Sequence, residues 1–261
     1  MKYIIPGMLC MLLALSCTRT NEQTAPTPNA STAVLDSAYF YSTGPKEIVY
    51  SATRFNYDAQ GRFTGTYATF TDSTIDHHLG APADTGTLVL SYNGMDALPA
   101  TYQYQEQKNY FPPSLLSYDN QNRVILDSPV NPIYTVHFTY GNSYVSWTGN
   151  YIAGDTIFID NHNISRYFDY FEGQTTYSYS SYPNPYYLPK LAGNVGIALV
   201  NNGTSFDLIS KNLFSKKVHS GYSKTYNYNW TLNANGQVVS GIGTDQDTGQ
   251  PVEYYQFVYK K

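Results

Sequence analysis

Several stretches of this 261-residue chain alternate apolar and polar residues with a period of two, and this pattern limits the possible folds more than any other feature. The clearest runs are residues 134–140 and 226–232, with shorter runs at 88–92 and 255–259. Alternation places apolar side chains on one face of a strand and polar ones on the other, as in antiparallel sheets. The chain is therefore predicted to be mainly β, a single antiparallel meander of hairpins.

A short turn motif separates some of these strands. Its three copies span residues 55–63, 116–124 and 230–238. In the first copy, Asp58 can hydrogen-bond the backbone ahead of it, and Gly61 can adopt the left-handed conformation that closes a tight turn. Residues 190–215 break the strand pattern. Ser205 or Asp207 is placed there to cap a helix, which predicts one short helix near residues 205–213.

The N-terminus predicts export and a lipid anchor. An apolar run, too short to span a bilayer, follows Lys2 and suits a signal peptide. It ends in Ala14-Leu15-Ser16-Cys17, which resembles the lipobox of bacterial lipoproteins; an ordinary secretory signal with an incidental cysteine is the alternative. The resemblance implies a signal peptide over residues 1–16 and lipidation of Cys17. Thr18 then favours the outer membrane, on a face that the sequence does not specify.

The remaining chain divides into a tether and one domain. Residues 17–33 are predicted to be the lipidated cysteine and a flexible tether rich in Thr and Pro, and residues 34–261 a single β-rich domain. Composition excludes other classes of protein. With 42% hydrophobic residues, 28 tyrosines and a net charge of −4, the chain is neither a highly charged disordered protein nor a nucleic-acid binder held by phosphate contacts.

The order of these features resembles a family of envelope lipoproteins of unknown function from Bacteroides-like bacteria. The resemblance rests on the lipobox, the tether, the hairpin motif, residues 181–187 and the Ser-Lys-Asn-Leu stretch at 210–213. The hairpin motif alone also resembles the YD-type repeat of large bacterial shell and toxin proteins, although its spacing here is uneven. The family resemblance implies a porin-like fold, a curled or barrel-like sheet, and it transfers neither catalytic residues nor porin activity.

Candidate catalytic residues are few. Two Asp-Thr-Gly triplets, at 84–86 and 247–249, match those of pepsin-like aspartic proteases in sequence, but neither follows an apolar strand, so both are interpreted as turns. Most aspartates lie beside turn residues, which leaves few carboxylates for a glycosidase pair. Asp76-His77-His78 is an isolated loop cluster without the spacing of a metal site. We expect no catalytic set, no metal and no cofactor.

One feature of the sequence that the interpretations above do not explain is a cluster of aromatic residues. The cluster consists of Tyr177, Tyr179, Tyr182, Tyr186 and Tyr187. Pro183 and Pro185 keep part of this stretch out of regular structure. Tyrosine rings on a loop offer apolar area and a hydroxyl group to sugar rings or peptides, so these five residues are the candidate ligand-binding site. Packing within a Tyr-rich sheet is the alternative.

These observations favour a lipid-anchored cell-envelope protein that acts as a non-enzymatic binding or structural module. The expected partners are the membrane, through the N-terminal lipid, and a glycan or another envelope protein, with no nucleic acid. Two other functions stay open. One is an envelope hydrolase, glycosidase or protease-like, that uses carboxylates, and the other is an accessory subunit of an outer-membrane assembly.

Replacing Cys17 by alanine tests the anchor. Cys17→Ala should release the protein from membranes and abolish labelling by a radioactive fatty acid, because the thiol that carries the lipid is lost. Continued labelling of the variant would refute the lipobox.

Overall fold

A computed structural model describes residues 34–43, 48–72, 84–106, 109–110, 112–132, 135–149, 152–169, 173–187, 210–221 and 223–260. The signal peptide, Cys17 and the tether lie outside the described residues. The strands are β1 (Leu35–Thr43), β2 (Ile48–Tyr57), β3 (Phe63–Asp72), β4 (Asp84–Tyr92), β5 (Pro99–Glu106), β6 (Asn109–Tyr110), β7 (Ser114–Tyr118), β8 (Val124–Pro129), β9 (Val136–Tyr140), β10 (Tyr144–Gly149), β11 (Ile152–Asp160), β12 (Asn163–Asp169), β13 (Gly173–Pro183), β14 (Asn212–His219), β15 (Lys224–Leu232), β16 (Val238–Asp245) and β17 (Pro251–Tyr259).

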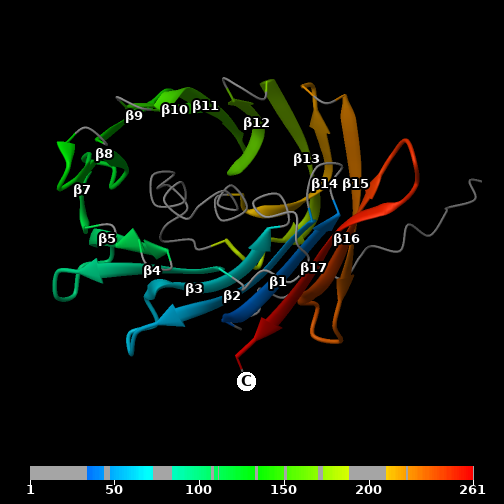
Figure 1. The fold of residues 1–261 in the computed structure, drawn as a ribbon, viewed down its shortest axis with the longest axis horizontal. Coiled ribbons are helices and arrows are strands. Elements are labelled where there is room, and N and C mark those ends of the chain that lie inside the picture. Colours follow the sequence, from blue (N-terminus) through cyan, green and yellow to red (C-terminus); the bar gives the residue numbers. More distant parts are fainter. Residues whose placement is uncertain are drawn as a thin grey trace, which may run out of the picture.

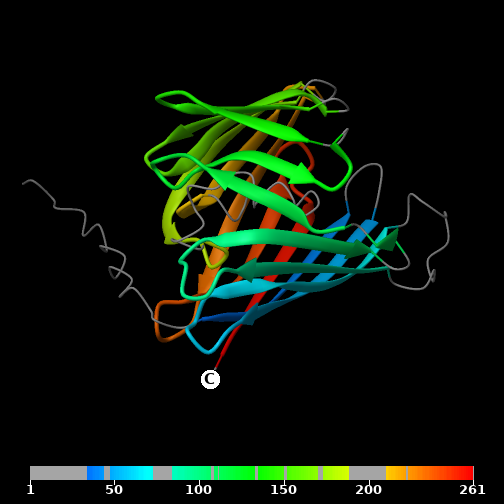
Figure 2. The same cartoon turned by 90° about the vertical axis from the view of Figure 1, so that its left-hand side faces the viewer.

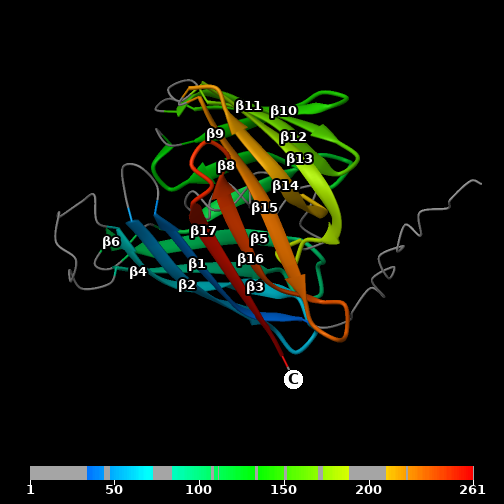
Figure 3. The ribbon, with the colours of Figure 1, turned by 90° about the vertical axis from the view of Figure 1, so that its right-hand side faces the viewer.

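The strands form one antiparallel sheet that closes into a barrel. Each strand pairs with the next along the chain, except that β6 and β7 both pair with β5, and β1 pairs with β17 as well as with β2. The wall therefore has sixteen strand positions. Figure 1 looks into the ring, and Figures 2 and 3 show the strands crossing the wall obliquely. The prediction of a mainly β meander that curls into a barrel-like sheet is confirmed.

The alternation of apolar and polar residues sorts side chains between the two faces of this wall. On β15, Tyr228 is buried while Asn227 and Asn229 are exposed, and on β9 the buried Val136 and Phe138 flank an exposed His137. The buried face is the inner one. Tyr186 follows β13, yet its ring lies 5.9 Å from that of Phe55 on β2 and 5.2 Å from that of Phe257 on β17. Contacts with strands so far around the ring place these side chains inside the barrel.

The core is therefore a lining of the inner wall. Its buried members include Phe55, Leu88, Val136, Trp147, Ile157, Phe214, Tyr228, Tyr255 and Phe257. Phe214 and Tyr228 meet edge to face with ring centroids 4.3 Å apart, and Trp230 packs against the same cluster. Edge-to-face aromatic pairs add about 0.5–1.5 kcal/mol each beyond the area that they bury. Tyrosine and tryptophan thus take much of the packing role that leucine has in most cores.

The predicted turn motif forms the β2–β3, β7–β8 and β15–β16 hairpin turns. In the second copy, the Asp119 carboxylate accepts hydrogen bonds from the backbone N–H of Gln121 and Arg123, at 2.9 Å each, and from the Arg123 side chain. These bonds, the Arg123 N–H first among them, lower the pKa of Asp119. Asn122 closes the turn with a φ of 62°, the conformation that Gly61 adopts in the first copy. In a strict meander, alternate turns lie at the same end, so all three turns share one rim.

Tyrosine side chains link neighbouring strands at this turn rim. Five hydroxyls donate to a carbonyl near the start of the preceding strand in the wall: Tyr92 to Phe63 (2.6 Å), Tyr118 to Pro99 (2.5 Å), Tyr140 to Val124 (2.7 Å), Tyr179 to Ile164 (2.6 Å) and Tyr259 to Val238 (2.7 Å). Two motif arginines stack on such rings, since Arg62 lies 4.4 Å from the centroid of Tyr92 and Arg123 4.4 Å from that of Tyr140. We call these five hydrogen bonds the tyrosine bridges.

The prediction of a helix near residues 205–213 is wrong where it can be compared. β14 begins at Asn212, so Asn212 and Leu213 are strand residues, and Leu213 packs into the core because the inner wall continues through it. Residues 205–209 lie outside the described part of the chain. Within that part, no helix is both long and apolar enough to cross a membrane.

Removing one tyrosine bridge tests its contribution. Tyr140→Phe deletes the hydroxyl that donates to Val124 and should lower the free energy of unfolding by about 1 kcal/mol, the usual value for one such hydrogen bond. Urea denaturation of the mature chain measures the change. Tyr144→Phe, on an exposed ring of the adjacent strand, is the control. Equal stability of the two variants would contradict a bridging role.

Candidate binding site on the inner barrel wall

The five tyrosines of the predicted cluster lie on β13 and the segment after it. Tyr177, Tyr179 and Tyr182 belong to β13, which continues as far as Pro183, while Tyr186 and Tyr187 follow the strand. All five are partly buried, and all but Tyr187 pack against the core. Tyr177 and Tyr179 come together in one hollow, whereas Tyr186 packs between Phe55 and Phe257.

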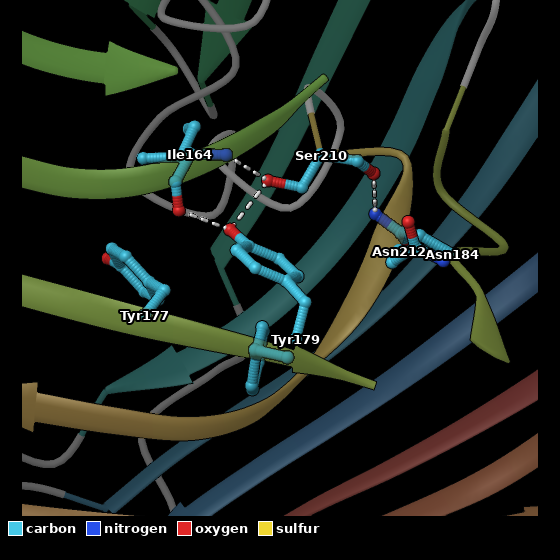
Figure 4. A pocket seen from close by; sticks show the side chains of 7 residues that line it. Ile164, Tyr177, Tyr179, Asn184, Ser210 and Asn212 are labelled. Atoms are coloured by element: carbon cyan, nitrogen blue, oxygen red, sulfur yellow. Dashed lines mark hydrogen bonds between the residues drawn. The ribbon is translucent and has the colours of Figure 1, made fainter. Parts of the chain in front are cut away.

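The hollow lies between β12, β13 and the start of β14, toward the turn rim. Its lining residues are Ile164, Tyr177, Tyr179, Asn184, Ser210, Asn212 and Phe214. The hollow is shallow: its cavity volume is about 10 Å³, roughly the space of one water molecule. Figure 4 shows the Tyr179 ring pointing toward Ser210, with Tyr177 to its left in this view and Asn184 and Asn212 to its right.

A hydrogen-bond network fixes the geometry of the hollow. The Tyr179 hydroxyl donates to the Ile164 carbonyl and lies 2.8 Å from the Ser210 Oγ, which accepts from the Ile164 N–H at 3.1 Å (Figure 4). The Asn184 Nδ2 donates to the Ser210 carbonyl at 2.8 Å. The Asn212 backbone N–H donates to Asn163 Oδ1 at 2.8 Å. Because these bonds hold Asn184, Ser210 and Asn212 in place, the hollow presents a rigid combination of aromatic faces, amides and hydroxyls.

A buried ion pair forms a second polar group on the inner wall, farther from the turn rim. Lys217 Nζ on β14 lies 2.9 Å from Glu253 Oε1 on β17. Tyr228 and Tyr255 donate to the other carboxylate oxygen, Oε2, at 2.8 and 2.9 Å. Burial alone would raise the pKa of Glu253, but the charge of Lys217 and these hydrogen bonds hold it below the ordinary value.

The neighbouring His219 is uncharged at neutral pH. Its Nδ1 lies 2.8 Å from the hydroxyl of Thr175 on β13, and its ring meets that of Tyr226 edge to face. Burial, and after it the charge of Lys217, lowers the pKa of His219 to about 4. The sequence did not predict the ion pair of Lys217 and Glu253, because these residues are 36 positions apart in the chain. The signal in the sequence is that Glu253 falls on the same alternating, inward-facing positions of its strand as Tyr255.

The carboxylates of the inner wall are held separately. Glu253 is bound by Lys217, and Asp245 by Lys224 at 2.9 Å. Asp127 on β8 accepts from the Tyr102 hydroxyl, and Asp155 on β11 accepts from the Tyr167 hydroxyl at 3.1 Å. Within the described ranges, no group of three or more His, Cys, Asp and Glu side chains is placed to hold a metal ion. Asp76-His77-His78 lies outside those ranges.

The two Asp-Thr-Gly triplets have different structures. The second is a turn, as predicted: Asp245 accepts from the backbone N–H of Asp247 at 2.8 Å, and Gly249 has a φ of 68°. The interpretation of the first as a turn is wrong, because β4 begins at Asp84 and the triplet forms the start of that strand. Its residues pair with β3 from Phe70 to Ala68, so the sheet ladder, rather than turn chemistry, determines their conformation.

Comparison with known proteins supports the fold. No protein-family model and no curated protein sequence matches the chain. Among solved structures, a porin-like protein from Bacteroides uniformis matches with a TM-score of 0.53 and 13% sequence identity, over 87% of this chain and 96% of that one. The match bears out the porin-like, barrel-like fold that the family resemblance implied, and at this identity it concerns the fold alone.

The ion pair can be tested by removing one or both charges. Lys217→Met leaves the buried Glu253 carboxylate without its cation and should destabilise the barrel by about 3–5 kcal/mol. The double variant K217M/E253Q, in which no charge remains, should recover most of that loss. Thermal unfolding at neutral pH measures both effects. A double variant as unstable as the single one would show that the pair acts through packing rather than charge.

Proposed function

We propose that this protein is a lipid-anchored protein of the cell envelope, bound to the outer membrane through Cys17, whose barrel acts as a non-enzymatic binding module for a glycan. The hollow beside Tyr179 carries the proposal. It combines the faces of Tyr177 and Phe214 with the amides of Asn184 and Asn212 on a rigid wall. Sugar rings present apolar faces and hydroxyl groups together, and a ring that rests over this shallow hollow would meet both kinds of surface.

A channel through a lipid-embedded wall is a poorer explanation of the same barrel. A membrane barrel turns an apolar band toward lipid, and polar residues there are costly. Here the outward positions of β15 include Asn227, Asn229 and Thr231, all exposed, while the tyrosines and Trp230 of that strand turn inward. On this strand, the arrangement supports a wall that faces water, with the barrel attached to the membrane through its tether; other strands expose apolar side chains such as Val89 and Phe168.

A hydrolase has less support than a binding module. Glycosidases require two carboxyl groups about 5–10 Å apart that act on one bond. The inner-wall acids Asp127, Asp155, Asp245 and Glu253 are each engaged by a different partner on a different strand. A role as an accessory subunit is supported by apolar side chains on the outer surface, since Leu115 is 62% exposed and Val130 74%. Co-purification with a membrane partner that is lost in Leu115→Asp would favour that role.

Binding to a panel of polysaccharides and peptidoglycan fragments tests the proposal. Tyr177→Ala and Asn212→Ala should each weaken binding about tenfold, equivalent to about 1.4 kcal/mol, because each removes one contact of the hollow. Titration calorimetry on the mature chain measures the affinity.

Tyr144→Ala is the matched control, since it removes an exposed tyrosine from the outer face. Circular dichroism confirms that each variant is folded. Glycan binding that is unchanged in both hollow variants, or lost equally in the control, would refute the proposed site.

A further inference from the structure

The barrel wall is held by few backbone pairs between β8 and β9. Among the described residues these strands share two register pairs, Leu126 with His137 and Asp127 with Val136. The flanking junctions β7–β8 and β9–β10 have five pairs each. We call the β8–β9 junction the seam. With only two register pairs, as few as β5 shares with β7, the seam is a place where the wall can open locally at low cost.

A buried carboxyl group with an incomplete set of hydrogen bonds lies at this seam. Asp127 is 6% exposed. Its Oδ2 accepts from the Tyr102 hydroxyl on β5 at 2.5 Å, and the Ser114 hydroxyl on β7 also hydrogen-bonds the carboxyl group. Its Oδ1 is buried and has no hydrogen-bond partner among the described residues. A buried polar atom without a partner is rare in folded proteins and destabilises them, and more so when it carries charge.

No cation in the described part of the chain acts on the charge of Asp127. Tyr102 faces it from β5, Ser114 and Leu116 from β7, and Val136 from β9. On the adjacent position of β9, His137 is exposed on the outer face. Burial raises the pKa of Asp127, while the Tyr102 and Ser114 hydrogen bonds act in the opposite direction without overcoming it.

We propose that Asp127 is a proton-controlled latch on the seam: the neutral acid stays buried and keeps β8 against β9, and loss of its proton to water opens the seam. The ionised carboxylate leaves a charged, unpartnered oxygen in an apolar wall, and opening lets water solvate it. The latch thus gives the barrel a side opening that closes as the pH falls.

The difference in the pKa of Asp127 between the closed and open states determines the pH range in which the seam opens. The pKa of Asp127 is raised by folding, so its contribution to the closed state is complete below the pKa of an ordinary aspartate, about 3.9. That contribution is lost as the pH rises through the folded pKa. Within this window, the opening equilibrium constant rises about tenfold per pH unit, and above the window it is constant.

Hydrogen exchange of the mature chain, followed by mass spectrometry from pH 4 to pH 8, tests the latch. Asp127→Asn keeps the shape of the side chain but cannot ionise. The ratio of wild-type to variant exchange in β8 and β9 should be near one at pH 4, rise about tenfold per pH unit in the window and then level off. Taking this ratio removes the intrinsic pH dependence of exchange, which both proteins share.

Two further variants and one reference region separate the latch from general destabilisation. Tyr102→Phe removes a donor to the carboxylate and should extend the window to higher pH. Asp96→Asn, at an exposed aspartate, should follow the wild type. In the β15–β16 ladder, which has seven register pairs, the ratio of wild-type to variant exchange should be independent of pH for every variant. A ratio independent of pH, or an equal rise at β15–β16, would overturn the proposal.

Discussion

The pairing of β1 with β17 is the constraint on which the rest of the structure depends. It joins strands from opposite ends of the chain through seven register pairs and leaves no edge in the wall. Closure of the sheet also creates the enclosed interior of the barrel. The same alternation that gives each strand an apolar face would leave that face exposed in an open sheet, whereas in the ring all those faces meet. The aromatic lining, the hollow and the buried ion pair exist only because the ring is complete.

The tyrosine bridges account for much of the unusual composition. A buried tyrosine needs a partner for its hydroxyl, and the turn rim supplies one repeatedly, as the carbonyl near the start of the neighbouring strand. Each bridge couples packing with a directed hydrogen bond between neighbouring strands. This explains how a chain with 13% charged residues keeps its strands in register with few ion pairs.

The strands and turns could be predicted from sequence because their causes are local. Alternation marked β4, β9, β15 and β17, and the Asp-x-x-Gly motif, with Asn122 in place of glycine in its second copy, marked the turns at Asp58 and Asp119. Long-range contacts could not be predicted in this way. Nothing near Glu253 points to Lys217, and nothing near Asp127 points to Tyr102, because the wall brings them together. For residues 177–187, the prolines suggested a loop, but β13 ends at Pro183, where a missing N–H costs the ladder little.

The two ends of the barrel meet as partners in the sheet. Leu35 is paired with Tyr259, and the Lys260 N–H donates to the Val34 carbonyl at 2.9 Å. The gap between the start of β1 and the end of β17 is therefore equivalent to any other hairpin connection on the turn rim. A short linker could join these ends and new ends could be opened at another turn, giving a circular permutant with the same wall. The barrel is in effect a ring, and the point where it attaches to the rest of the chain is a matter of connectivity rather than of folding.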